Sequence, residues 1–231
     1  MGDSWGVGEW GWNLSGTYTT LHPGLGQYVS EAGHSVVNIS RGMASNRSQV
    51  DALLTYLATA SPPRRMVWFV TDPLRDFDGY MSKSYDQQVA NFFAPLQTLQ
   101  QYRAAKDQLL RLQLERVKHL GVGLIGGVQP LPHWVSSEFS KLCVICPDLR
   151  RWLMPGYDLV DGPFIVRTWN YPDVSPALAE YFALQERLFA RHCQRVQDAH
   201  SLEHGYFHPD NVHPNRQAHH RLAHELILPW L

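Results

Sequence analysis

The chain has 231 residues, of which 44% are hydrophobic and 12% aromatic, so it can bury a substantial core. A formal net charge of −1 argues against a basic surface for nucleic acid or an anionic membrane. No apolar run reaches the roughly 18 residues that a membrane span needs, and the polar, glycine-rich start is unlike a signal peptide. We therefore expect a cytoplasmic protein, with a virion or an unconventional secretion route as the open alternatives.

The predicted strands and helices alternate along the chain. Short apolar, β-rich runs predict buried strands at residues 35–40, 66–70, 121–127 and 142–145. Helical spacing of apolar residues predicts helices at 46–59, 84–119, 176–196 and 216–228, the second of them broken at Pro95. This order favours an α/β fold with a mostly parallel sheet. Without a repeat or a linker, we expect one domain over 1–231, with a long loop at 156–176.

The first candidate site residue lies at the N-terminus. Gly2-Asp3-Ser4 has the composition of a turn that leads into a helix, where a backbone amide can stabilise a developing oxyanion. A serine hydroxyl becomes a good nucleophile only when a nearby base takes its proton. The base must therefore come from elsewhere in the chain. The competing interpretation is that Ser4 simply caps the helix.

The best candidate for that base is His213, near the other end of the chain. Asp210 precedes it by three residues, and a carboxylate at that spacing can accept a hydrogen bond from the Nδ1–H of the imidazole. Such a bond fixes the tautomer of the histidine and stabilises its protonated form. Ser4, His213 and Asp210 therefore form a candidate catalytic triad.

These two stretches resemble those of the SGNH (GDSL-type) hydrolases. Gly2-Asp3-Ser4 matches the family's first block, and Asp210-x-x-His213 with the following Pro-Asn matches its last. The resemblance implies a three-layer α/β/α sandwich of the flavodoxin-like type and an esterase or carbohydrate O-deacetylase that needs no cofactor or metal. It also implies a small-molecule or carbohydrate ester as the substrate, and it leaves the oligomeric state open.

The resemblance further implies an oxyanion hole and a substrate-binding surface. The backbone amides of Ser4 and Gly42 would be two of the oxyanion donors, with Met43 as an alternative register. The family's third block normally supplies an asparagine, but here Thr71 stands at that place before Asp72. We therefore assign Thr71 as the third donor, with Asn46 as the alternative.

Trp5, Asn46 and Asp72 are the expected substrate-binding residues. Trp5, Trp10 and Trp12 concentrate aromatic side chains near Ser4, where exposed rings could carry an acyl chain or a sugar ring.

Two further expectations concern the N-terminus and the alternatives to an esterase. The family has a buried strand before Gly-Asp-Ser, whereas only Met1 precedes Gly2 here, so we expect the natural chain to begin further upstream. The main alternative function is a non-catalytic binding or structural module on the same fold, which the substitution at Thr71 would favour. A metal site in the histidine-rich stretch 204–224 is a weaker alternative, because its spacing matches no established motif.

Overall fold

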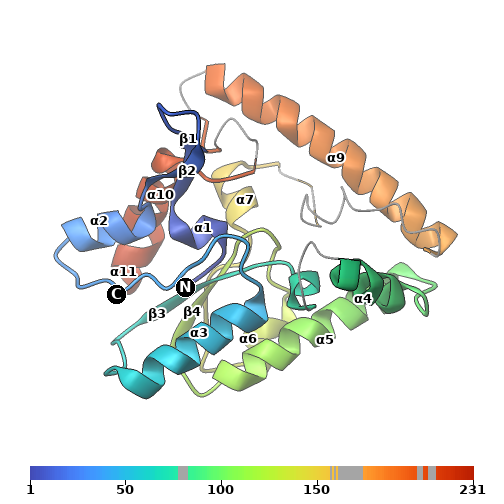
Figure 1. Ribbon diagram of the computed structural model, residues 1–231, viewed down its shortest axis with the longest axis horizontal. Helices are drawn as coiled ribbons and strands as arrows, with labels where there is room; N and C mark the ends of the chain where they lie inside the picture. The colour runs from blue at the N-terminus through green and yellow to red at the C-terminus, as the bar shows by residue number, and fades with distance from the viewer. Residues whose placement is uncertain (78–82, 157, 159, 161–173, 202–204, 208–211) are drawn as a thin grey trace.

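The structure is a computed structural model that describes residues 1–77, 83–156, 158, 160, 174–201, 205–207 and 212–231 (Figure 1). It is an α/β protein built around a parallel three-stranded sheet. The strands are β3 (Met66–Val70), β4 (Val122–Gly126) and β5 (Cys143–Cys146), and they lie in the order β3-β4-β5. Three of the four predicted strands are thereby confirmed. Within the described residues, no helix is long and apolar enough to cross a membrane.

Apolar clusters cover both faces of this sheet. On one face, Trp68 and Val70 of β3 pack with α3 (Asn46–Thr59) and α5 (Leu99–Val117). On the other face, Phe69 packs with α2 (Leu25–Glu31), α7 (Leu149–Leu153) and α10 (Arg216–Leu222). Successive side chains of a strand point to opposite faces, so a continuously apolar run is what a doubly covered strand requires. The helix predicted at 46–59 is confirmed.

A third apolar cluster joins the helices beside the sheet. It contains α4 (Lys83–Phe93), the start of α5 and the long helix α9 (Pro176–Ser201), which runs along the upper right edge of the molecule in Figure 1. The predicted break at Pro95 is confirmed, because the chain leaves helical structure between Phe93 and Leu99. Most of the expected loop at 156–176 lies outside the described residues.

The shorter elements complete the chain. A 3₁₀ turn, η1 (Pro73–Asp76), follows β3, and α6 (Trp134–Glu138) lies between β4 and β5. The helix predicted at 216–228 is confirmed but irregular, since α10 continues through a π-helical turn, η2 (Ala223–Ile227), into α11 (Leu228–Trp230). The C-terminus therefore returns to the side of the sheet near the N-terminus (Figure 1).

An antiparallel hairpin that we did not predict follows the first turn of the chain. Its strands are β1 (Glu9–Trp12) and β2 (Tyr18–His22). The Asn13 side chain closes the connecting loop by accepting hydrogen bonds from two backbone amides, those of Ser15 and Thr17. Gly8 has a φ of +145°, and a Cβ there would come within 2.2 Å of the His22 carbonyl oxygen. Only glycine allows the base of the hairpin to approach this closely.

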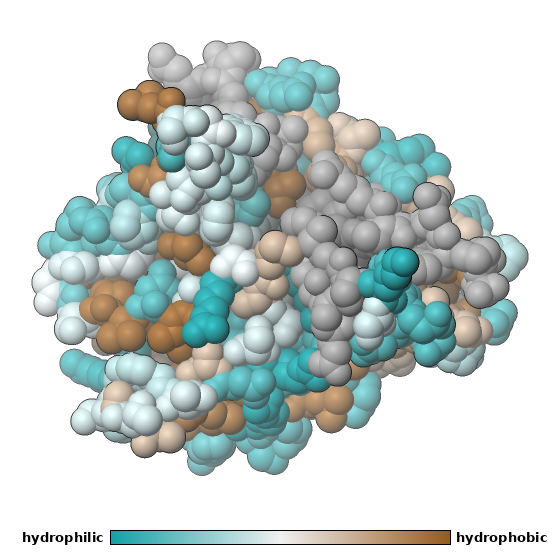
Figure 2. All heavy atoms as spheres, in the orientation of Figure 1, coloured by the Kyte–Doolittle hydropathy of each residue, from teal (hydrophilic) through white to brown (hydrophobic). Residues whose placement is uncertain are grey.

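Residues 35–40, predicted as a buried strand, form no strand. Val36 and Val37 are 39% and 60% exposed, and Figure 2 shows hydrophobic surface between α2 and α3. A strand needs a neighbour to satisfy its backbone groups. Among the described residues, the backbone bonds next to this segment involve Met1 and Gly2. The Met1 amine donates to the Val67 carbonyl and the Met1 carbonyl accepts from the Phe69 amide, while the Gly2 carbonyl accepts from the Arg41 amide.

A groove of about 520 Å³ continues from Met1 between β3 and residues 35–40. Its lining includes Val36, Val37, Ile39, Val67 and Phe69. Burial at the end of this groove lowers the pKa of the Met1 amine to about 5. The groove has the position and the apolar lining that an added strand parallel to β3 would need.

An engineered strand should therefore stabilise the protein. Fusing about five alternating valine and threonine residues before Met1 should raise Tm by about 2–8 °C, because new ladder hydrogen bonds and burial contribute about 1–2 kcal/mol. A Gly-Ser extension of equal length is the control, since it adds the same chain without the apolar side chains. Equal Tm values for the two fusions in calorimetry would contradict the assignment of the groove.

Candidate active site

Ser4 is the first residue of α1 (Ser4–Val7), a single helical turn beside the end of β3. Asp3 caps this turn, since its Oδ1 accepts a hydrogen bond from the Trp5 amide at 3.0 Å. A Cβ on Gly2 would lie 2.9 Å from the Phe69 Cβ, so glycine lets the chain pass close to β3 at this point. Within the described part of the chain, no acceptor faces the backbone N–H of Ser4.

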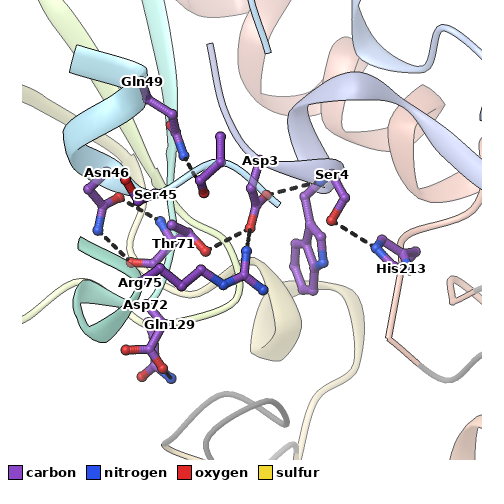
Figure 3. A network of polar contacts seen from close by, with 12 residues as sticks. Asp3, Ser4, Ser45, Asn46, Gln49, Thr71, Asp72, Arg75, Gln129 and His213 are labelled. Carbon is purple, nitrogen blue, oxygen red and sulfur yellow. Dashed lines mark hydrogen bonds and ion pairs between the residues drawn. The ribbon is translucent and has the colours of Figure 1, made fainter. Parts of the chain in front are cut away.

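His213 is brought to Ser4 by the segment before α10. Phe207 and Pro214 form an isolated antiparallel bridge, and the Asn215 amide donates to the Tyr206 carbonyl at 2.9 Å. The Asn215 side chain also caps α10 by accepting from the Ala218 amide. These bonds fix the backbone on the C-terminal side of His213. The Nε2 of His213 lies 2.8 Å from the Oγ of Ser4, and Figure 3 shows the two side chains pointing toward each other.

The other ring nitrogen of His213 contacts the hairpin. Its Nδ1 lies 3.2 Å from the phenol oxygen of Tyr18, on β2. Asp210, which we expected at this nitrogen, lies outside the described residues. Tyr18 is therefore a site residue that the sequence analysis missed. The sequence signal for the hairpin that carries Tyr18 was the set of aromatic residues on either side of the Asn13 loop, namely Trp10 and Trp12 before it and Tyr18 after it.

A buried polar network holds Asp3 from the other side (Figure 3). The Oδ2 of Asp3 accepts from the Thr71 hydroxyl at 2.7 Å and from the Arg75 guanidinium at 3.0 Å. Thr71 is fully buried, and its single hydroxyl hydrogen is donated to this carboxylate. We expected that hydrogen to point at an oxyanion. In this arrangement it instead fixes Asp3, the residue that precedes Ser4.

The three expected substrate-binding residues also lie beneath the surface. Asn46 is fully buried, and its amide both donates to the Thr71 carbonyl and accepts from the Thr71 amide, at 2.9 Å each. Asp72 caps η1 by accepting from the Leu74 amide at 3.0 Å. Trp5 is 2% exposed in the apolar core. Their positions support the loops around Ser4 from below and give them no open surface toward a substrate.

Gly42 lies at the edge of the site in an exposed turn. A Cβ on Gly42 would be 3.2 Å from the Trp10 ring, and the Trp10 indole N–H donates to the Ser4 carbonyl at 2.8 Å. The next residue, Met43, has a φ of +63°, which is strained for a residue other than glycine. Among the described residues, the Gly42 N–H has no acceptor, so it remains a candidate donor.

The described histidines do not form a metal site. No group of three or more histidine, cysteine, aspartate or glutamate side chains within the described ranges could hold a metal ion. His219 is buried, and this burial lowers its pKa to about 4. The rings of His220 and His224 lie 4.3 Å apart beside Tyr28 of α2. His204, His208 and Asp210 lie outside the described residues.

Comparisons of the chain with protein-family models, with curated proteins and with solved structures found no match.

The hydrogen bond from Thr71 to Asp3 allows a test between a structural role of the Thr71 hydroxyl and a role as an oxyanion donor. Thr71→Val should lower the free energy of unfolding by about 1.5–3 kcal/mol, because a buried carboxylate loses a donor. Thr71→Ser keeps a hydroxyl and should recover much of that loss. Urea denaturation of both variants measures the effect. A Thr71→Val protein of unchanged stability would contradict the bond, and would return Thr71 to the role of oxyanion donor.

Asp76 predicts a pH dependence of stability. Its Oδ1 accepts from the Arg47 amide at 2.9 Å, and burial raises the pKa of the carboxyl to about 7. Because the folded protein favours the neutral acid, this stabilisation is complete below about pH 4 and is lost as the pH rises through about 7. Asp76→Asn keeps an acceptor for Arg47 without ionising.

The variant should therefore become more stable relative to the wild type between about pH 5 and about pH 8 in urea titrations. Asp86→Asn, at an exposed position on α4, is the control and should leave the difference constant. An Asp76→Asn protein whose stability parallels the wild type over this range would contradict the assigned pKa.

Proposed function

We propose that this protein is a serine hydrolase of the SGNH type, with the three-layer α/β/α arrangement of that family, which cleaves esters by acyl transfer. The observation that carries the proposal is the 2.8 Å contact between the Oγ of Ser4 and the Nε2 of His213. These residues are 209 positions apart in the chain, and the contact is the one that a serine nucleophile and its general base require. A helix cap alone would not need His213.

In the proposed reaction, Ser4 transfers its proton to the Nε2 of His213 while its Oγ attacks the ester carbonyl carbon. The tetrahedral intermediate collapses as His213 returns the proton to the departing alcohol, which leaves an acyl-serine. Water then attacks the acyl carbon while His213 takes its proton, and the bond to Oγ breaks as His213 returns that proton to Ser4 and the acid is released. Asp210 keeps its proposed role as a carboxylate that orients His213. No cofactor enters these steps.

The backbone amides of Ser4 and Gly42 are the proposed oxyanion donors. Ser4 begins a helical turn, and its N–H has no acceptor among the described residues, so it is available to a carbonyl oxygen held above the nucleophile. The Gly42 turn packs on Trp10, which is itself bonded to the Ser4 carbonyl. Thr71 acts in this proposal through Asp3, by keeping the turn that carries Ser4 in place.

The proposed substrate is a small ester or an O-acetylated carbohydrate. The hairpin places aromatic rings beside His213, and Trp12 is 68% exposed with its ring edge against Tyr18 at 5.3 Å between centroids. An exposed aromatic face is a suitable surface for a sugar ring or for a short acyl chain. A preference between acetyl and longer esters separates these two substrate types.

Hydrolysis of p-nitrophenyl acetate and butyrate tests the proposal. The wild type should hydrolyse at least one of them, whereas Ser4→Ala and His213→Ala should each lower kcat by about 10³-fold or more, because each removes a member of a unit that acts together. Labelling by a fluorophosphonate probe should follow the same order. Ser48→Ala is the control and should change neither readout, because it removes an exposed hydroxyl on α3 that donates to the Ser45 carbonyl and not to a histidine.

A folded wild type that is inactive toward both esters, toward acetylated sugars and toward the probe would contradict the enzyme. The non-catalytic module on the same fold would then be the better interpretation. Equal labelling of the wild type and Ser4→Ala would contradict Ser4 as the nucleophile.

A further inference from the structure

The β1–β2 hairpin contacts both members of the Ser4–His213 pair. Trp10 on β1 donates its indole N–H to the Ser4 carbonyl at 2.8 Å. Tyr18 on β2 places its phenol oxygen 3.2 Å from the Nδ1 of His213. The two aromatic rings are stacked, with centroids 5.9 Å apart and planes 25° apart. One small element therefore holds the backbone of the nucleophile and the ring of the base.

The position of the ring hydrogen on neutral His213 determines whether Tyr18 donates or accepts the hydrogen bond. A neutral imidazole has one N–H, and the Nε2 that accepts the Ser4 hydroxyl hydrogen must be the unprotonated nitrogen. The ring hydrogen is then on Nδ1, where it faces the Tyr18 oxygen. That oxygen carries lone pairs and accepts this hydrogen bond. When His213 gains a second proton from Ser4, the Nδ1–H becomes a stronger donor and the bond strengthens.

The hairpin is held firmly enough to aim the phenol. Its base closes through Gly8, and Glu9 forms an ion pair with Arg216 of α10 at 3.1 Å. Trp12 pairs directly with Tyr18 across the hairpin and meets it edge to face. Because α10 also follows the His213 segment, the hairpin and the histidine are tied to the same helix. The contact at Nδ1 is thus fixed from both sides.

We propose that Tyr18 is a positioning residue that selects the tautomer of His213 and stabilises its protonated form during acyl transfer. This inference rests on the proposed function for its catalytic consequence, although the contact at Nδ1 does not. The phenol and the proposed carboxylate of Asp210 address the same N–H. Tyr18 reaches it across 195 positions of sequence, whereas Asp210 is three residues from the histidine.

The direct test is the Nδ1–H proton of His213, observed by NMR in the wild type and in Tyr18→Phe. Phenylalanine keeps the ring that stacks on Trp10 and removes only the acceptor. Loss of the acceptor should move this resonance upfield and speed its exchange with water, because the ring N–H loses its hydrogen bond. The resonance is assigned by its absence in His213→Gln. An unchanged Nδ1–H resonance overturns the inference, whether or not the protein is an esterase.

Kinetics give the second readout. In Tyr18→Phe, kcat should fall about 3- to 10-fold, KM should stay within about twofold, and the acidic limb of the pH profile should move to lower pH. Thr19→Val is the matched control, because it removes a hydroxyl from the adjacent residue of β2, whose side chain points to the opposite face of the hairpin. It should leave kcat and the pH profile unchanged.

A third measurement separates Tyr18 from Asp210. If both act on the same Nδ1–H, the loss of rate on Tyr18→Phe should change when Asp210→Asn is already present. A purely structural role for Tyr18 predicts equal losses of rate in both backgrounds, together with a fall in Tm that tracks activity. That result would overturn the positioning role. An inactive wild type whose His213 Nδ1–H resonance still responds to Tyr18→Phe would contradict the esterase alone.

Discussion

The buried carboxylate of Asp3 is the interaction on which the rest of the site depends. One of its oxygens caps the turn that begins at Ser4, and the other accepts from Thr71 and Arg75 beyond the end of β3. A carboxylate with 1% exposure is costly unless its lone pairs are satisfied, and here three donors satisfy it. The position of Ser4 is therefore fixed by contacts from the end of β3 and from η1, in addition to the short helix that carries it.

The same logic explains why Asn46 and Asp72 are buried. Asn46 holds the Thr71 backbone by both its amide and its carbonyl, so it fixes the strand end from which Thr71 reaches Asp3. Asp72 turns the chain into η1, and Gln129 donates to it at 3.2 Å. These residues form a second layer of support beneath Ser4. Residue types that are often found at substrates here serve the rigidity of the site.

The sequence predicted the parts of this protein that depend on local pattern. The strands predicted at 66–70 and 121–127 follow from continuous apolar runs, because both faces of the sheet are covered, and the helix at 46–59 follows from periodicity. Residues 35–40 also contain three β-branched apolar residues but form no strand, since a strand depends on a neighbour that composition does not reveal. Spacing likewise placed Thr71 at a strand end, but it could not show that the hydroxyl points at Asp3 rather than outward. The hairpin was not predicted because Trp10 and Trp12 were interpreted as a substrate-binding surface and not as part of a strand that pairs with residues 18–22.

The β1–β2 hairpin connects Ser4 with His213 through its own side chains. Ser4 and His213 come from opposite ends of the chain, and in a simple triad their relative position depends on the packing of α1 against the segment before α10. Here Trp10 and Tyr18 stack on each other while each holds one of the two residues, so a displacement of the hairpin moves both groups together. The same element exposes Trp12 to solvent. The hairpin therefore joins the contacts of Ser4 and His213 to an exposed aromatic ring, and in the proposed hydrolase that ring borders the bound ester.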